Sequence, residues 1–259
     1  MRKVGRPKSE AGIKVTGHWS LGKIDTSSFL SRNSINTISK KNQPMNKQKE
    51  IDKYILNHIE PEDEILRELD RETNLNVLGA RMISGHLQGQ VLSMLSKMIR
   101  PKTILEIGTF TGYSAICLAK GLQEGGKLIT LEINDELENI AKKYFEKAGI
   151  QHKIEQRIGA ALDIIPTLNE TFDLVFIDAH KPEYPAYYES VIGKVNIGRY
   201  IIADNTLWNG KVLENPADDD FQTRGIIEFN TIIKNDNRVE KVILPLRDGM
   251  TIIRKKQSN

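Results

Sequence analysis

The chain of 259 residues contains one cysteine, Cys117. A single thiol excludes an internal disulfide and a zinc site built from several cysteines. Cys117 stands in the apolar stretch ICLA, which favours a place in the core over a role as a nucleophile. The chain also lacks any run of about 18 consecutive apolar residues, so it predicts no membrane-spanning helix. The N-terminus has no apolar segment typical of a secretory signal, and we therefore expect a cytoplasmic protein.

Acidic residues are scarce at the N-terminus. Residues 1–50 hold 11 Lys or Arg against 3 Asp or Glu, so the basic balance of the whole chain belongs to this segment. Residues 1–45 are polar and show no sustained periodicity, which is typical of a disordered basic extension or a segment introduced for expression. Within it, Arg2–Lys8 reads RKVGRPK and resembles an AT-hook, whose Gly-Arg-Pro core fits the DNA minor groove. A solvated basic tail explains the same residues.

The remainder of the chain predicts an α/β fold. Two short helices are expected at Ile51–Ile59 and Glu62–Leu69, and a third helix follows, in which Leu87, Val91, Leu95 and Met98 share one face that we expect to be core. Short apolar strands then alternate with helical segments. The expected strands are Thr103–Ile107, Lys127–Leu131, His152–Arg157, Phe172–Ile177 and Tyr200–Ala203. The expected helices lie near Tyr113–Leu122, Asp135–Ala148, Ala161–Leu168 and Glu183–Ile192. This alternation implies a parallel sheet covered on both faces.

The C-terminal segment has a different pattern. A helix near Phe221–Ile233 precedes the strand Val239–Leu244, and the turn Arg247-Asp248-Gly249 leads into a second strand, Met250–Arg254. Such a turn between two apolar strands indicates a hairpin. The last strand is therefore expected to run antiparallel to the others.

The stretch TILEIGTFTGYS places an acid and two glycines where the first strand opens into a helix. Its spacing, Glu106-x-Gly108-x-x-x-Gly112, differs from the G-x-G-x-x-G of dinucleotide sites. Glu106 would repel a phosphate and attract a cation, such as the sulfonium and ammonium of S-adenosylmethionine. The second strand ends at Glu132, whose carboxylate could accept hydrogen bonds from both ribose hydroxyls. Small residues after the third strand, Gly159 and Ala160, would leave room for an adenine.

Polar residues also follow the fourth and fifth strands. Asp178 ends the fourth, and Asp204 and Asn205 end the fifth. Because these strands are expected to be neighbours, the three side chains should meet at one edge of the sheet. Three oxygen ligands without Cys or clustered His favour a hard cation, Mg²⁺ first, with Mn²⁺ or Ca²⁺ as alternatives. A turn at residues 204–205 and a helix cap at Asp178 are the structural alternatives.

These motifs together resemble those of a known family. The segments LEIGTFTGYSA, LEIN, GAALDIIP, FIDAHKPEY, ADNTLWNG and RDGMTIIRK occur in the order found in the cation-dependent class I O-methyltransferases, which include the catechol and caffeoyl-CoA enzymes. The resemblance runs from about Met82 to the C-terminus. It implies a Rossmann-like, doubly wound sheet of seven strands, mostly parallel with an antiparallel C-terminal strand. It also implies that residues 46–259 form one S-adenosylmethionine-dependent methyltransferase domain, and it suggests a homodimer.

The resemblance assigns roles to individual residues. It implies that Asp178, Asp204 and Asn205 are the metal ligands and that Lys181 is the general base. The cofactor-binding residues that it implies are Glu106, Gly108, Ser114, Glu132, Ala160 and Asp178. It implies Trp208 and Asn209 as residues on the substrate side.

The expected reaction is metal-dependent methylation of a hydroxyl on a catechol-like or caffeoyl-type small molecule, a phenolic substrate. A phenol has a pKa near ~10 and is a poor nucleophile at neutral pH, and a bound divalent ion lowers that pKa. Lys181 could accept the proton only when neutral, so we expect its pKa to be lowered by the metal and by burial. Two alternatives are methylation of a hydroxylated uridine in tRNA and DNA binding through the basic tail.

Overall fold

The computed structural model describes residues 43–257. Residues 1–42, with the AT-hook-like segment Arg2–Lys8, and residues 258–259 lie outside the described part of the chain. Backbone contacts divide the chain after Asn46. The second unit is Lys47–Asn259, and the body described below is its residues 47–257. The assignment of residues 1–45 as a separate extension stays a prediction.

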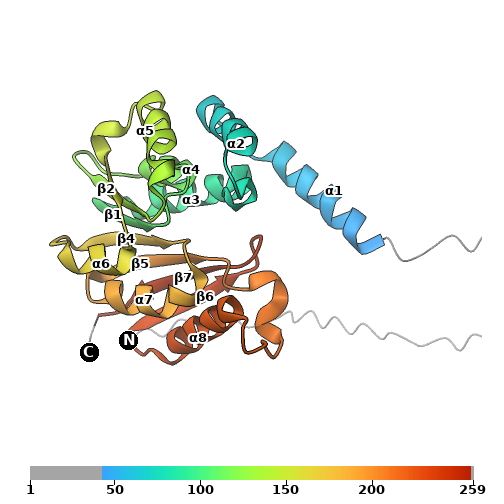
Figure 1. Cartoon of the computed structure of the whole chain (residues 1–259), viewed down its shortest axis with the longest axis vertical. Coiled ribbons are helices and arrows are strands. Elements are labelled where there is room, and N and C mark those ends of the chain that lie inside the picture. Colours follow the sequence, from blue (N-terminus) through green and yellow to red (C-terminus); the bar gives the residue numbers. More distant parts are fainter. Residues whose placement is uncertain (1–42, 258–259) are drawn as a thin grey trace, which may run out of the picture. The chain divides into compact units, whose positions relative to one another are not determined.

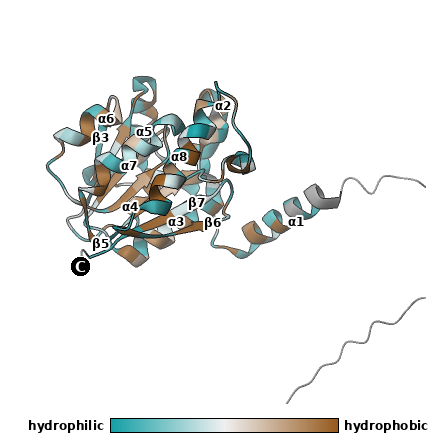
Figure 2. Ribbon diagram, turned by 90° about the horizontal axis from the view of Figure 1, so that it is seen from below, coloured by the Kyte–Doolittle hydropathy of each residue, from teal (hydrophilic) through white to brown (hydrophobic). Residues whose placement is uncertain are grey.

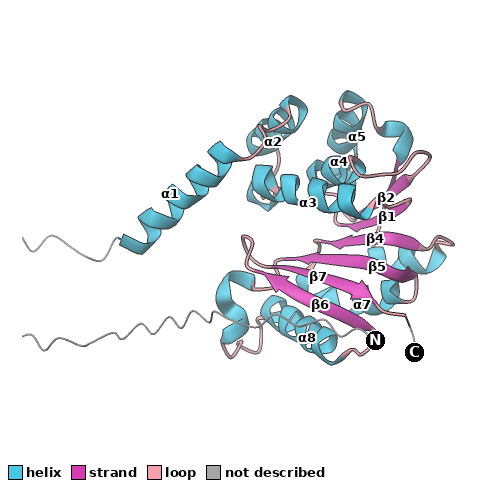
Figure 3. Ribbon diagram, turned by 180° about the vertical axis from the view of Figure 1, so that it is seen from behind, coloured by secondary structure: helices cyan, strands magenta, loops and turns pink. Residues whose placement is uncertain are grey.

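The body is built on a seven-stranded sheet with the strand order β3-β2-β1-β4-β5-β7-β6 (Figure 3). Strands β1 to β5 pair in parallel, and β7 is antiparallel to both of its neighbours, β5 and β6. The expected fold class, with an antiparallel C-terminal strand, is therefore confirmed. The strands are β1 (Thr103–Ile107), β2 (Lys127–Glu132), β3 (Ile154–Ile158), β4 (Phe172–Ile177), β5 (Val195–Asp204), β6 (Val239–Leu244) and β7 (Met250–Lys255).

Helices alternate with the strands, as the sequence predicts, although several are shorter than expected and begin or end with a 3₁₀ turn. The α-helices are α1 (Gln43–His58), α2 (Glu64–Asn76), α3 (Gly85–Ile99), α4 (Tyr113–Ala119), α5 (Glu138–Lys147), α6 (Ala161–Ile164), α7 (Tyr184–Ile192) and α8 (Phe221–Asn235). The 3₁₀ turns are η1 (Ala80–Met82), η2 (Asp135–Leu137), η3 (Gln151–Lys153), η4 (Ile165–Thr167), η5 (Lys181–Glu183) and η6 (Trp208–Leu213).

Helices α2 to α8 form a layer on each face of the sheet (Figure 1). Helices α2, α3, α4 and α5 pack with one apolar cluster, which includes Ile104 and Phe176 of the strands. Helices α6, α7 and α8 pack with a second cluster on the other face, which includes Leu105 and Val175. All six residues of β4 are buried, because a central parallel strand is covered on both faces. Apolar residues accordingly concentrate on the central strands in Figure 2.

Helix α3 buries a different face from the one predicted. Its buried residues are mostly small or polar and are Gln88, Gly89, Leu92, Ser93 and Ser96. Met98, expected in the core, is 75% exposed, whereas Val91 and Leu95 are only partly buried. The small face allows close packing, since a Cβ on Gly89 would lie 2.6 Å from the Tyr113 ring of α4. The apolar residues of α3 therefore lie beside its buried face and not at the centre of that face. The expectation that Cys117 lies in the core is confirmed.

Among the helices of residues 43–257, none combines the length and the apolar character that crossing a membrane requires.

Candidate active site

The polar residues singled out in the sequence converge at the carboxyl ends of four adjacent strands. Ile177 of β4 pairs with Ala203 of β5, so the next residues, Asp178 and Asp204, stand side by side at one edge. Asn205 follows with a left-handed φ of 57°, a conformation that Asn tolerates better than most residues. The register thus brings together the three proposed metal ligands.

Gly108 forms the floor of the turn after β1. Its φ is 101°, and a Cβ at this position would lie 2.0 Å from the carbonyl oxygen of Asp178. The Asp178 N–H in turn donates to the Ile107 carbonyl at 2.9 Å. Only glycine allows the β1 and β4 ends to approach so closely. Gly108 therefore allows the close approach of the chain after β1 to the chain after β4.

Glu106 is a fully buried carboxylate at the end of β1. Its Oε2 accepts a hydrogen bond from Thr130 at 2.5 Å, whereas its Oε1 is buried without a partner. Burial raises the pKa of Glu106 to about 8, against the lowering effect of Ser114 and Thr130. An unpaired buried acceptor is costly, and a cationic ligand would satisfy it. The ammonium of S-adenosylmethionine fits this requirement.

Glu132 ends β2 and is held by the backbone. Its Oε2 accepts from the Phe110 N–H at 2.7 Å and its Oε1 accepts from the Asn134 N–H at 2.9 Å. Each oxygen keeps a second lone pair, so the carboxylate can still accept two ribose hydroxyls. Ser114 is buried in the first turn of α4, and Ala160 stands at the start of α6. These positions follow β1 and β3, on the same edge as Glu132.

Asp204 is, like Glu106 and Glu132, a buried acid of the site, 3% exposed. Its Oδ2 accepts from Gln88 Nε2 at 2.7 Å, and its Oδ1 is buried without a partner. Burial and the nearby charge of Asp178 raise the pKa of Asp204 to about 6. Two adjacent carboxylates with an unsatisfied oxygen form a fitting site for a hard cation. Within residues 43–257, no three His, Cys, Asp or Glu side chains are placed to hold a metal ion. Asn205 as a third ligand stays a prediction.

Lys181 lies in η5 and is buried against the proposed metal ligands. Its Nζ donates to Asp178 Oδ1 and to the Tyr184 hydroxyl, each at 2.8 Å. Burial favours the neutral amine, as expected, but the charge of Asp178 and the contacts with Tyr184 outweigh it and leave the pKa of Lys181 above its ordinary value. The expected lowering is therefore wrong. The physical reason is that the carboxylate of Asp178, 2.8 Å from Nζ, stabilises the ammonium more than burial destabilises it.

Trp208 and Asn209 begin η6, the 3₁₀ turn that follows β5. Both have positive φ, 46° and 52°, as does Gly210 beside them. The Trp208 ring is partly buried, and its centroid lies 6.0 Å from Lys181 Nζ, whereas Asn209 is exposed. Trp208 therefore borders the same space as the proposed base.

The hairpin between β6 and β7 holds this loop in place. The Gly249 carbonyl accepts from the Thr206 N–H at 3.0 Å, and the Asp248 carbonyl accepts from the Leu207 N–H at 2.8 Å. A Cβ on Gly249 would lie 2.6 Å from the Leu207 nitrogen, so glycine is required here too. The hairpin predicted from the sequence thus buttresses the segment that follows Asp204.

Three site residues were missed by sequence reasoning: Gln88, Tyr184 and Arg247. Tyr184 donates to the Asp204 carbonyl at 3.0 Å and accepts from Lys181. Its place three residues after Lys181 at a helix start was a usable signal. Gln88 and Arg247 carried none, because nothing in the sequence distinguishes Gln88 from Gln90 two residues later.

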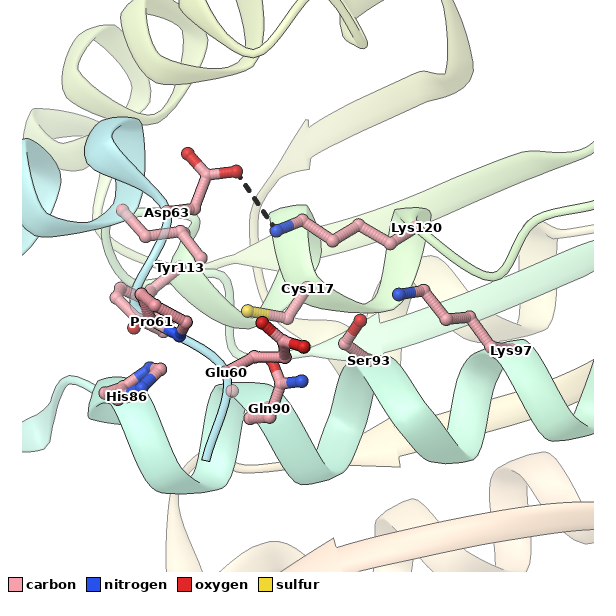
Figure 4. A pocket seen from close by; sticks show the side chains of 12 residues that line it. Glu60, Pro61, Asp63, His86, Gln90, Ser93, Lys97, Tyr113, Cys117 and Lys120 are labelled. Carbon is pink, nitrogen blue, oxygen red and sulfur yellow. Dashed lines mark hydrogen bonds and ion pairs between the residues drawn. The ribbon is translucent and has the colours of Figure 1, made fainter. Parts of the chain in front are cut away.

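A separate cavity of about 230 Å³ lies between the segment before α2 and helices α3 and α4 (Figure 4). Its walls include His86, Ser93 and Cys117, and Lys120 forms an ion pair with Asp63 at its rim at 3.2 Å. None of the proposed metal, cofactor or substrate residues lines it. This cavity is therefore distinct from the candidate active site at the carboxyl ends of the strands.

The chain is similar to known proteins over most of its length. The model of the O-methyltransferase family matches residues 57–256. The chain belongs to the O-methyltransferase family. A caffeoyl-CoA O-methyltransferase of Petroselinum crispum is 39% identical to this O-methyltransferase over 206 residues, which cover 75% of this chain and 85% of the relative. A caffeoyl-CoA O-methyltransferase of Nicotiana tabacum is 37% identical over 208 residues, with the same two coverages.

Solved structures extend the similarity to bacterial members of the family. The O-methyltransferase TomG of Streptomyces achromogenes, involved in tomaymycin synthesis and solved with SAM, has a TM-score of 0.75 and 30% identity, and the match covers 80% of this chain and 96% of TomG. The O-methyltransferase of Bacillus cereus, solved with SAH, has a TM-score of 0.75 and 32% identity, with coverages of 80% and 97%. The expected enzyme class, an S-adenosylmethionine-dependent O-methyltransferase, is confirmed.

Proposed function

We propose that this O-methyltransferase transfers the methyl group of S-adenosylmethionine to a hydroxyl of a catechol-like or caffeoyl-type small molecule, and that it requires a divalent cation, Mg²⁺ in the first place. The observation that carries the metal requirement is the unpartnered, buried Oδ1 of Asp204 beside the carboxylate of Asp178. The phenolic acceptor is supported by the similarity to the caffeoyl-CoA enzymes.

Asp178, Asp204 and Asn205 would hold the cation, with water or substrate oxygens completing its shell. The cofactor, when bound, supplies the electrophilic methyl group, and the cation lowers the pKa of the acceptor hydroxyl. Lys181 Nζ would take the hydroxyl proton. The Asp178 carboxylate that now raises the pKa of Lys181 is also a proposed metal ligand, so a cation would share its charge.

The chain's own residues would align the two substrates. Glu106 would bind the cofactor ammonium and Glu132 its ribose, while Gly108 lets the methionine part approach the backbone. Trp208 and Asn209 would border the acceptor. Methyl transfer is an in-line displacement, which depends on alignment more than on covalent help from the protein.

The test is a radiolabelled methyl-transfer assay with catechols, caffeoyl esters, flavonoids and tRNA, each with Mg²⁺ and with EDTA. We expect turnover of the phenolic acceptors, its loss in EDTA and its return when Mg²⁺ is added. Asp204→Ala should abolish it, and Asp219→Ala, a change at an exposed acid, should not. Undiminished turnover in metal-free buffer would contradict the metal requirement, and labelling of tRNA alone would favour the RNA alternative.

A homodimer is proposed from the family resemblance alone. Sedimentation of the purified chain would measure its mass in solution, which is 29.3 kDa for one copy.

A truncated chain beginning at residue 46 should keep full turnover, since the described site residues all lie beyond that point.

A further inference from the structure

Gln88 of α3 connects two segments that are far apart in the sequence. Its side chain is 1% exposed and lies between Asp204 at the end of β5 and Arg247 in the hairpin between β6 and β7. Gln88 Nε2 donates to Asp204 Oδ2 at 2.7 Å. Gln88 Oε1 accepts from Arg247 Nη1 at 2.9 Å. One buried amide thus joins a proposed metal ligand to the hairpin.

The chemistry of the three groups fixes the direction of this amide. A guanidinium only donates hydrogen bonds, so Arg247 must face the oxygen of Gln88. An ionised carboxylate only accepts them, so Asp204 must face the NH₂ group. The reversed amide would place donor against donor and acceptor against acceptor. Arg247 therefore selects the orientation in which Gln88 donates to Asp204.

Arg247 is itself tied to the start of α3. Its Nη1 also donates to the backbone carbonyl of Ser84, and lies 3.4 Å from the carbonyl of Ile83. The same nitrogen thus contacts the helix that carries Gln88. Arg247 is an exposed residue, but these contacts restrain its guanidinium against both the start of α3 and the Gln88 side chain.

The link gives the two oxygens of Asp204 different states. Oδ2 is satisfied by Gln88, and Oδ1 is buried with no hydrogen-bond partner. The hydrogen bond restricts rotation of the carboxylate, so Oδ1 remains the oxygen without a partner. A preset ligand loses less conformational freedom on binding than a mobile one.

We propose that Gln88, oriented by Arg247, is a positioning residue that presents Oδ1 of Asp204 to the cation. This inference rests on the proposed metal requirement, because it assigns the cause of the metal affinity and not its existence. Neither residue touches the reacting atoms in this assignment. Both act through Asp204.

The test measures Mn²⁺ binding to the cofactor-free protein by the loss of the free-ion EPR signal. The variants are Gln88→Met, which keeps the length without the amide, and Arg247→Met. Groups behind metal ligands typically contribute about 10- to 100-fold in metal affinity. We expect Gln88→Met to raise the Kd for Mn²⁺ by about tenfold or more, and Arg247→Met to raise it by a smaller factor.

Matched controls separate positioning from general loosening. Gln90→Met changes the same residue type on the same helix, at a side chain that lines the separate cavity. Arg254→Met changes an exposed arginine of β7 that pairs with Glu240. Both should bind Mn²⁺ like the wild type. The Kd for S-adenosylmethionine should stay within about twofold in all four variants, since positioning acts on the metal side.

A double variant tests the order of the link. If Arg247 acts only through Gln88, then Gln88→Met with Arg247→Met should bind Mn²⁺ no more weakly than Gln88→Met alone. Additive losses would overturn the assignment of Arg247. Should Gln88→Met fail to fold, Arg247→Met carries the test, because Arg247 is on the surface.

The possible failures are distinguishable. Wild-type Mn²⁺ binding with unchanged affinity in Gln88→Met and Arg247→Met would overturn this inference and leave the proposed function intact. Absence of Mn²⁺ binding by the wild type, with turnover in EDTA, would overturn the proposed metal requirement and the inference with it.

Discussion

Gly225 of α8 lies in direct contact with the backbone of Lys181. A Cβ at Gly225 would be 2.4 Å from the Lys181 carbonyl oxygen and 2.6 Å from Cα of Pro182. Both neighbours are backbone or ring-bound atoms, which cannot move aside as a flexible side chain does. The position of Lys181, the proposed base, therefore depends on the absence of a Cβ at residue 225 of α8.

Gly225→Ala should lower both stability and turnover. Alanine favours a helix by up to about 1 kcal/mol over glycine, but overpacking a tight contact costs about 1–3 kcal/mol, so the steric term decides the sign. The control is Gly193→Ala, where the φ is −64° and no atom lies within 4 Å. That change should be neutral or stabilise by about 0.4–1 kcal/mol. Urea unfolding and kcat check both variants, and a Gly225→Ala enzyme with normal kcat would show that η5 tolerates displacement.

Lys181→Met should reduce kcat by about 10²- to 10³-fold, within the range for loss of a general base. The Kd for S-adenosylmethionine should change little, because the substitution leaves the proposed cofactor-binding acids Glu106, Glu132 and Asp178 in place. Lys181→Arg discriminates between roles, since arginine keeps the charge but cannot accept a proton at neutral pH. Substantial activity in Lys181→Arg would contradict the base role and favour a purely electrostatic one. Lys234→Met, on the exposed side of α8, is the control.

The raised pKa of Glu106 predicts a pH-dependent stability. The carboxyl has an ordinary pKa of 4.5 and one of about 8 in the folded, cofactor-free protein. The folded state therefore holds a proton between these values that the unfolded state has lost. This contribution to stability is complete below pH 4.5 and disappears as the pH rises through about 8.

Glu106→Gln removes this pH dependence, because glutamine stays neutral. Relative to the wild type, the variant should gain thermal stability as the pH rises from 5 to about 8.5. Other titrating groups are common to both proteins and cancel in the difference. Glu124→Gln, at an exposed glutamate, should show a flat difference over the same range. A flat difference for Glu106→Gln as well would contradict a buried, protonated Glu106.

Cofactor binding should release the proton of Glu106. The cationic ammonium of S-adenosylmethionine favours the ionised carboxylate, which lowers the pKa of Glu106 in the complex. The affinity of the protein for S-adenosylmethionine should therefore increase with pH up to about 8. Glu106→Gln should abolish this trend and lower the affinity. Calorimetry in two buffers with different ionisation enthalpies counts the protons released. Proton uptake on cofactor binding would contradict contact between the cofactor ammonium and Glu106.

The sequence predicted most of the fold because buried parallel strands have a strong local signature. Strand β4 reads FDLVFI, and its boundaries were predicted without error. Strand β5 begins five residues earlier than predicted, because its first part, from Val195, passes a register irregularity at β4 before regular pairing resumes at Tyr200. Local apolarity indicates the regular segment but not the irregular one.

The site was predicted only as far as strand ends reveal it. Asp178 and Asp204 follow apolar runs, and topology alone places such residues together. Gln88 and Arg247 reach the site from a helix and a turn, through side chains whose direction depends on the packed fold. The protonation of Lys181 also depends on a 2.8 Å contact with Asp178 that the spacing of three residues does not determine.

Trp208 is expected to contribute to acceptor binding and not to cofactor binding. The centroid of its ring lies 6.0 Å from Nζ of Lys181, the proposed base. Trp208→Ala removes an aromatic surface for a phenolic ring, whose pairing is worth about 0.5–1.5 kcal/mol beyond area burial. We expect the KM of the acceptor to rise by about tenfold, which is 1.4 kcal/mol. The Kd for S-adenosylmethionine should not change. Trp208→Phe should recover most of the acceptor affinity, because a ring of the same kind returns to the site. Equal losses for acceptor and cofactor in Trp208→Ala would instead indicate collapse of the loop after Asn205, and calorimetry of S-adenosylmethionine binding to both variants decides between the two.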